Sequence, residues 1–229
     1  MTMPFYAPPE QVMKDKADYA RKGIARGRSL VAVRYDGGIA IVAENTSATL
    51  RKVSEIYDRI AFAGVGRYNE FDQLRIAGVR HADLKGFAFS REDVDARSLA
   101  NAYAQSLGQV FTHEMKPMEV EILVAEIGLD ADGRGDQMFH ILYDGTVVDE
   151  DDWVVLGGET EEISERCAAA LPDAPRGLAD AVRAAVAALA GPDRTLGAAS
   201  LETAVLDRSN GRRAFRRLTD AEVSAILDA

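Results

Sequence analysis

The segment most suggestive of chemistry is Gly64-Val65-Gly66-Arg67-Tyr68-Asn69, which lies between an apolar, β-rich run and a helix-like run. A dinucleotide-binding loop occupies such a position, because closely spaced glycines let the backbone approach a pyrophosphate. Asn69 stands where the third glycine belongs, and the preceding segments read as hairpins rather than a βαβ unit. We expect Gly64 and Gly66 to permit a tight strand-to-helix turn. A nucleotide-binding enzyme is the third-ranked function.

An acidic turn and three histidines are the candidate metal ligands. Residues 130–136 resemble a calcium loop, but Arg134 occupies a ligand position and Ile141 stands where the bidentate glutamate is needed. The histidines, at positions 81, 113 and 140, lack paired ligand spacing. We expect a solvated turn, structural histidines, no metal and no cofactor.

Local motifs give equally little support for a catalytic serine or cysteine. The sequence contains no Gly-x-Ser-x-Gly elbow, and the single cysteine, Cys167, lies in a helix-like run without a catalytic signature. One cysteine cannot form an intrachain disulfide, which favours a reducing compartment. The N-terminus lacks the basic and apolar regions of a signal peptide, and no apolar run reaches membrane-span length. We therefore expect a cytoplasmic protein with no membrane partner.

The composition argues against nucleic acid as a partner. The chain has 229 residues, 47% of them apolar, and a net charge of −10, which suits a sizeable core and disfavours a phosphate-binding surface. The arginines at 212, 213, 216 and 217 are expected to form a solvated strand face or subunit salt bridges. The acidic run Asp149 to Asp152 is expected to be a solvated turn.

The elements that position these residues occur in blocks. A helix is predicted over 10–22, started by Pro8 and Pro9. Two hairpins follow, over 30–35 with 39–43 and over 53–56 with 60–63. A helix capped by Asn69 should bury Phe71, Leu74 and Ala77, and another should span 98–113.

The second half repeats this order. Strands are predicted over 120–127, 138–143, 146–148 and 153–156, helices over 160–170 and 176–190, and a strand pair over 200–206 and 213–217. Thr219 to Glu222 form a capping box that opens a last helix. Blocks of strands followed by blocks of helices indicate antiparallel sheets covered by helices. Two stacked sheets would give four layers.

Over nearly its whole length the chain resembles α-type subunits of the 20S proteasome, in particular those of actinobacteria. The matching blocks are Pro9-Glu10-Gln11, residues 19–26 (YARKGIAR), 51–59 (RKVSEIYDR), 69–72 (NEFD), 99–105 (LANAYAQ), 116–117 with 119–121, 143–145 (YDG), 157–158 and 213–217 (RAFRR). Many dispersed blocks in one order are more specific than any single motif. The resemblance implies an α+β, four-layer αββα sandwich of the N-terminal nucleophile hydrolase type. It also implies one domain over 1–229, divided into a gating tail (1–8), a helix (9–24) and a core (29–229).

The resemblance further implies heptameric α rings that cap rings of catalytic β subunits. In those β relatives a processed threonine begins the first strand beside an aspartate and a lysine, at positions that fall near Arg28, Glu44 and Lys52 here. The nucleophile is therefore expected to be absent, and the chain to be a non-catalytic subunit of a threonine-type endopeptidase complex. Thr2 is no substitute, because Pro4, Pro8 and Pro9 follow it too closely for a central strand.

Function is then expected in gating and docking. In the family the α N-terminal segments close the axial pore, which assigns Met3, Phe5 and Tyr6 to the gate, and Pro9 and Tyr19 match residues that support the open gate in archaeal relatives. The tyrosine-aspartate pair of the archaeal tail has no counterpart here. Lys52 matches the lysine that pairs with an activator's C-terminal carboxylate, in a groove lined by Gly66 and Arg67.

The partners implied are β subunits, further copies of the chain, a ring-shaped ATPase or other activator, and unfolded protein substrates in transit. The resemblance to the actinobacterial members further implies substrates tagged by a small ubiquitin-like protein, as in the Pup-proteasome pathway. The second-ranked function is an active N-terminal-nucleophile threonine peptidase of the β type.

Overall fold

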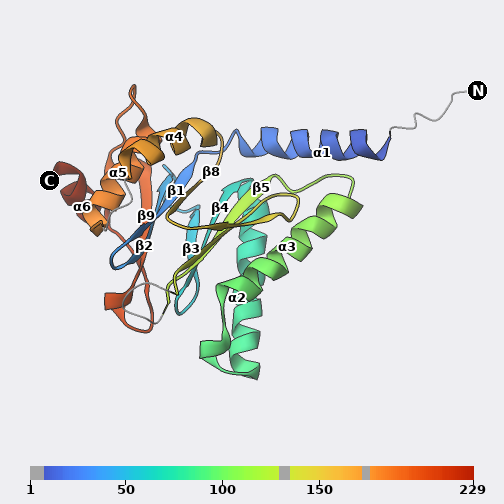
Figure 1. Cartoon of the computed structure of the whole chain (residues 1–229), viewed down its shortest axis with the longest axis horizontal. Coiled ribbons are helices and arrows are strands. Elements are labelled where there is room, and N and C mark those ends of the chain that lie inside the picture. Colours follow the sequence, from blue (N-terminus) through green and yellow to red (C-terminus); the bar gives the residue numbers. More distant parts are fainter. Residues whose placement is uncertain (1–7, 129–134, 172–175) are drawn as a thin grey trace, which may run out of the picture.

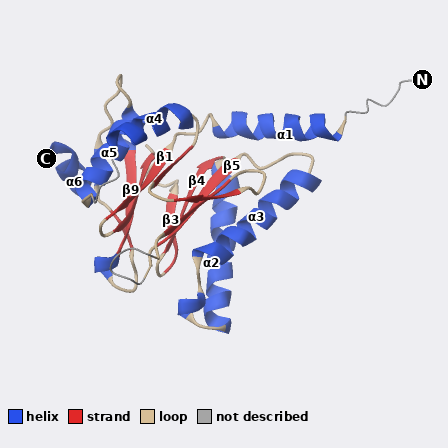
Figure 2. Ribbon diagram, in the orientation of Figure 1, coloured by secondary structure: helices blue, strands red, loops and turns tan. Residues whose placement is uncertain are grey.

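The computed structural model describes residues 8–128, 135–171 and 176–229. Within these ranges the chain forms ten β-strands and six α-helices. The strands make two five-stranded antiparallel sheets that stack face to face, with helices on both outer faces (Figures 1 and 2). The αββα sandwich predicted from the order of the elements is thus confirmed.

The first sheet has the strand order β10-β9-β2-β1-β8. Its strands are β1 (Leu30–Tyr35), β2 (Gly38–Glu44), β8 (Trp153–Leu156), β9 (Leu201–Asp207) and β10 (Phe215–Arg217). The predicted hairpin joins β1 to β2, with Leu30 opposite Ala43 and Tyr35 opposite Gly38. Gly38 has φ +151°, and a Cβ atom there would overlap the Leu206 carbonyl, so the tight turn requires glycine.

The second sheet has the strand order β3-β4-β5-β6-β7. Its strands are β3 (Val53–Tyr57), β4 (Ile60–Gly66), β5 (Val120–Glu126), β6 (Gln137–Ile141) and β7 (Val147–Glu150). β4 pairs antiparallel with both β3 and β5. A parallel βαβ unit, which dinucleotide binding needs, is therefore not formed around the Gly64 and Gly66 segment.

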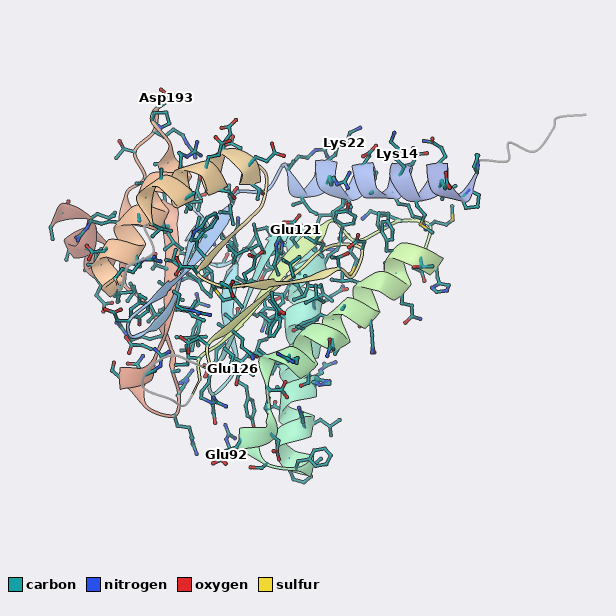
Figure 3. The ribbon with its side chains drawn as sticks, in the orientation of Figure 1. Lys14, Lys22, Glu92, Glu121, Glu126 and Asp193 are labelled. Carbon is teal, nitrogen blue, oxygen red and sulfur yellow. The ribbon has the colours of Figure 1, made fainter. Side chains whose placement is uncertain are left out.

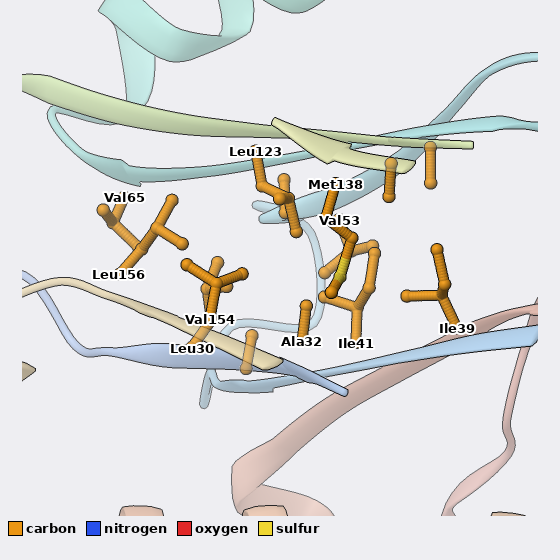
Figure 4. Close-up of a cluster of buried hydrophobic side chains, with 14 of the residues drawn as sticks. Leu30, Ala32, Ile39, Ile41, Val53, Val65, Leu123, Met138, Val154 and Leu156 are labelled. Atoms are coloured by element: carbon orange, nitrogen blue, oxygen red, sulfur yellow. The ribbon is translucent and has the colours of Figure 1, made fainter. Parts of the chain in front are cut away.

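Each pair of layers encloses its own apolar core. Between the sheets lie Leu30, Ile41, Leu123, Met138 and Val154, among others (Figure 4). Helices α4 (Thr160–Ala170), α5 (Leu178–Ala190) and α6 (Asp220–Asp228) cover the first sheet, and α2 (Tyr68–Ala88) and α3 (Ala96–His113) cover the second. In the described part of the chain, no helix combines the length and apolarity that crossing a bilayer requires.

Helix α1 (Pro9–Ile24) stands apart from these layers. Its last turns bury Ala20 and Ile24 in the core between the sheets, while its N-terminal half extends away from the body of the molecule (Figure 1). Pro9 is the first helical residue, a position where the missing N–H costs nothing. The helix thus closes one end of the sandwich and projects beyond it.

The start of α2 differs from the prediction. The N-cap is Arg67 rather than Asn69, and Ala77 is exposed whereas Gly78 is buried. The reason is the neighbouring helix: the Tyr103 hydroxyl of α3 packs so closely on Gly78 that a Cβ atom there would overlap it. A glycine therefore marks the buried stripe, which a count of apolar residues alone misses. The predicted Thr219–Glu222 capping box is present.

The acidic loop is not simply a solvated turn. Residues 129–134 lie outside the described part, but the Asp136 side chain is buried, accepts the Gly128 N–H at 2.9 Å and forms an ion pair with Arg208. The solvated-turn prediction is thus wrong for Asp136, because a long-range ion pair, invisible in the local sequence, compensates its burial.

Candidate functional site

The three residues at or near which the resemblance predicts the catalytic groups of the β relatives, Arg28, Glu44 and Lys52, meet in one cluster at the end of the sandwich closed by α1. Glu44 ends β2, and its backbone N–H donates to the Ser29 carbonyl across the hairpin at 3.0 Å. This pairing brings Arg28 alongside, and its Nη1 lies 2.7 Å from Glu44 Oε1. The Lys52 ammonium donates to the Arg28 carbonyl oxygen. The hairpin and the start of β3 together position all three residues.

Arg194 completes this cluster and was not predicted. Its Nη1 lies 3.3 Å from Glu44 Oε2, so the buried carboxylate is held between two guanidinium groups. Other N–H groups of Arg194 donate to the carbonyls of Leu189 and Ala190 at the end of α5. A basic residue just after a helix is a recognisable signal for such carbonyl contacts. Its distance of 150 positions from Glu44 is bridged only by the fold.

The chemistry available at position 28 follows from these contacts. A threonine-type nucleophile needs a hydroxyl and a free α-amine on the same residue. Arg28 offers a guanidinium engaged with Glu44, and its backbone nitrogen is an amide that continues through Gly27 into α1. The Gly27 N–H donates to the Ile24 carbonyl at 2.8 Å, which fixes this connection. The cluster holds charges in place but presents no activated nucleophile at this position.

The backbone of Lys52 is fixed by both sheets. Its N–H donates to Glu202 Oε2 on β9 at 2.8 Å, and its carbonyl accepts the Gly64 N–H of β4 at 3.0 Å. Glu202 is only 3% exposed; it also accepts the Asn45 side-chain amide at 2.8 Å and pairs with Arg217. The lysine therefore projects from an anchored strand end rather than from a loose loop.

The electrostatics of Lys52 are unusual for a lysine. The pKa of its ammonium is lowered to about 8, mainly by burial and to a smaller extent by Arg28, while the nearby carboxylates of Glu44 and Glu202 act in the opposite direction. An approaching carboxylate would stabilise the charged form, since a charge-assisted hydrogen bond favours ionisation. The half-buried ammonium is thus suited to receive an anion.

Gly66 lies against the same segment of chain. It has φ +98°, and a Cβ atom there would overlap the Glu119 carbonyl, which accounts for the glycine. A Cβ atom on Gly27 would lie 3.2 Å from the Gly66 nitrogen, so the Gly27–Arg28 segment contacts both Gly66 and Lys52. Gly64 likewise lies directly against Phe71. Both glycines serve the close packing expected of a strand-to-helix turn.

Arg67 belongs to a neighbouring cluster of charges. Its Nη1 lies 3.0 Å from Glu119 Oε2 and 3.7 Å from Glu70 Oε1. The Lys116 ammonium pairs with the same two carboxylates, at 2.9 Å from Glu70 and 3.0 Å from Glu119. The structure thus brings Lys52 and Gly66 into contact with one short segment, residues 27–28, while Arg67 is engaged with Glu119 and Glu70.

Of the five predicted gate residues, two lie in the described part of the chain. Met3, Phe5 and Tyr6 lie outside the described residues. Pro9 begins α1, and Tyr19 is 47% exposed on that helix. The Lys116 ammonium lies 5.8 Å from the centre of the Tyr19 ring, within the range of a cation–π contact. Tyr19 therefore touches the Arg67 cluster.

Comparisons with known proteins agree with this geometry. A sequence model of the family described as "Proteasome subunit" matches residues 24–192. A protein named "Proteasome subunit alpha" from Acidimicrobium ferrooxidans is 62% identical over 227 residues, covering 99% of this chain and 97% of its own length. Proteins of the same name from Sanguibacter keddieii and Thermobifida fusca are each 55% identical, covering 99% of this chain and 90% and 91% of their own lengths.

The family match covers most of the chain, including both hairpins and the Arg28, Glu44 and Lys52 cluster. The relatives match almost end to end, so α1 is included in the similarity. The chain therefore belongs to the proteasome subunit family, among its alpha-type members.

Proposed function

We propose that the chain is a non-catalytic α subunit that forms the heptameric outer ring of a proteasome core, gates substrate entry and docks a ring-shaped ATPase. The observation that carries this proposal is Arg28. It lies near the position that the resemblance predicts for the threonine of catalytic relatives, its backbone continues into α1, and its guanidinium is held by Glu44 at 2.7 Å. Seven such subunits would enclose an entrance, while partner β subunits supply the peptide-bond hydrolysis.

Docking is assigned to Lys52. A partly desolvated ammonium that meets a C-terminal carboxylate forms a charge-assisted contact of about 1.5–3 kcal/mol. Such a contact is weak alone, but several around one ring reinforce one another through effective concentration. Gly66 leaves backbone rather than side chain facing the Gly27–Arg28 segment, and Arg67 would border the groove on the α2 side. The partner is an activator that presents a free C-terminus.

Gating is assigned to the segment before α1, with Met3, Phe5 and Tyr6 as its apolar members. Helix α1 projects from the sandwich and begins at Pro9, so its outer end is held away from the two sheets (Figure 1). Pro9 and Tyr19 would fix the position of helix α1 and thus the point from which this segment extends. Substrates in transit would be unfolded proteins, delivered in the cytoplasm after attachment of a small ubiquitin-like tag.

Peptide hydrolysis tests this proposal. We expect the chain alone to be inactive, its complex with a β partner to cleave a fluorogenic peptide slowly, and deletion of residues 2–8 to raise that rate several-fold. Removal of the two exposed C-terminal residues, 228–229, is the control for truncation as such, because it leaves the buried Val223 of α6 in place.

Hydrolysis by the purified chain without a β partner would instead support the active threonine peptidase. Unchanged hydrolysis after deletion of residues 2–8 would reject the gate. Stabilisation of the chain by a dinucleotide in a thermal-unfolding assay would favour the nucleotide-binding alternative.

A further inference from the structure

The sandwich has an open sheet edge on each of two opposite sides. β7 and β8 are edge strands of the two sheets, and the two-residue turn Asp151–Asp152 joins them, so their edges lie on one side. β3 and β10 are the other two edge strands, and Arg217 of β10 donates to the Val53 carbonyl of β3. An open edge exposes unpaired backbone groups and is a natural place for association.

The β7–β8 edge is acidic. Between positions 144 and 152 the sequence has five carboxylates and no basic residue. Within the described structure, His140 lies between Glu121 and Glu150, at 3.4 and 3.8 Å, and Arg176 pairs with Asp152. Asp149 and Asp151 are exposed. Their negative charges face solvent, and a basic partner would compensate them.

The β3–β10 edge is basic in an otherwise acidic chain. Positions 51–59 and 212–217 together contain seven basic residues and two acidic ones, whereas the whole chain carries −10. Arg213 pairs with Glu55, and Arg216 and Arg217 pair with Glu222 and Glu202. Arg51 is exposed, and the Arg212 side chain is 79% exposed, with its Nε 3.9 Å from Asp58 Oδ2. The edge therefore keeps an excess of positive charge.

Opposite charges on opposite edges favour a particular mode of self-association. A contact between different surfaces of identical chains is heterologous, and it closes into a ring when the rotation between copies allows. We propose that the acidic β7–β8 edge of one copy docks on the basic β3–β10 edge of the next, around the ring. This inference rests on the proposed ring and assigns the surfaces that form it. Lys52, the residue before β3, then lies beside the seam between two copies.

Charge reversal tests the contact. Asp149→Lys with Asp151→Lys reverses two exposed charges of the acidic edge, and Arg51→Glu with Arg212→Glu reverses two exposed charges of the basic edge. Each pair of substitutions places its new charges opposite exposed charges of the same sign at every seam, so we expect at least a tenfold loss of rings when the full chain is expressed with its β partner. The combined variant, with all four substitutions, exchanges these exposed charges between the two edges and should recover ring formation. Ring content is measured by native mass spectrometry and electron microscopy.

The matched control is Asp193→Lys with Asp228→Lys, which changes the net charge as much as the first variant. Both control residues are exposed: Asp193 lies in the loop after α5 (Figure 3), and Asp228 ends α6. The control should assemble like the wild type. Circular dichroism of each variant distinguishes lost assembly from lost folding.

The outcomes separate this inference from the proposed function. Absence of rings from the wild-type chain with its partner would contradict the proposed function itself. Wild-type rings that persist in both reversed variants would overturn the edge contact. So would a combined variant that folds but fails to regain rings, because the two edges then do not face each other.

Discussion

Two clusters of charged residues lie near the α1 end of the sandwich, and the cations in them have different hydrogen-bond partners. The Lys52 ammonium is half-buried and donates to a backbone carbonyl, that of Arg28. Arg67 and Lys116 share the carboxylates of Glu70 and Glu119 in four contacts of 2.9 to 3.7 Å. The first cation is desolvated and bound to a neutral oxygen, whereas the second pair is already neutralised by carboxylates.

The difference indicates which cation can bind a ligand. A carboxylate that reaches Lys52 gains a charge-assisted contact without displacing another carboxylate from the ammonium. At Arg67 an incoming carboxylate would compete with Glu119 and would repel both acids of the cluster. We therefore expect Lys52 to carry activator docking and the Arg67 cluster to shape and hold the groove.

The largest effect is expected for Lys52→Ala. Loss of a contact of about 1.5–3 kcal/mol at each site weakens docking at least tenfold per site, and more when several sites engage together. Binding of the activator ring is measured by native electrophoresis or light scattering. Lys116→Ala is the matched control and should bind normally. If peptide cleavage by a complex lacking residues 2–8 falls equally, Lys52 supports assembly instead of docking.

The next effect concerns the support of Lys52. Glu202→Ala removes a carboxylate that receives the Lys52 N–H, the Asn45 amide and Arg217. Breaking a buried charge network costs about 3–5 kcal/mol, which lowers Tm by roughly 6–20 °C in a chain of this size. Thermal unfolding measures this change. Glu55→Ala removes a carboxylate from a more exposed ion pair with Arg213 and should cost less than about 1 kcal/mol; equal losses would contradict the distinction.

A moderate, pH-dependent effect should distinguish the two clusters. Because burial lowers the pKa of Lys52 to about 8, its ammonium loses its proton above that pH, and docking should weaken several-fold between pH 7 and 9. The free energy of unfolding should instead rise between pH 8 and 10, because the unfolded chain keeps the lysine proton to a higher pH than the folded chain does. Affinity is measured across this range. Lys52→Arg keeps its charge and should show a flat profile; a falling profile in that variant would assign the titration elsewhere.

The smallest effect is expected for Arg67→Ala. Its side chain is 51% exposed, and Lys116 remains to pair with both carboxylates. Exposed ion pairs contribute about 0–1 kcal/mol, so docking should change by no more than about fivefold. An activator-binding titration checks this. A loss as large as that of Lys52→Ala would place the ligand carboxylate on Arg67.

Much of the fold followed from local patterns. The turn of the first hairpin at Asp36-Gly37, the two strands that it joins and the capping box at Thr219 depend on neighbours within a few residues, and each is present in the structure. The N-cap of α2 and the burial of Gly78 were missed. Both depend on contacts with other elements, and an apolar-periodicity argument assigns a buried glycine no weight.

The candidate site shows the same division. The sequence by itself determined the residue at position 28, the segment that precedes it, the order of strands and helices, and the unequal charges of the two edges. Each of these is a property of residue type and order. Only the tertiary structure brought Arg194 to Glu44, anchored Lys52 on Glu202 and separated Arg67 from Lys52. These contacts join residues as many as 150 positions apart. The residues of each contact become neighbours only when the strands pair and the two sheets stack, so no local sequence pattern predicts them.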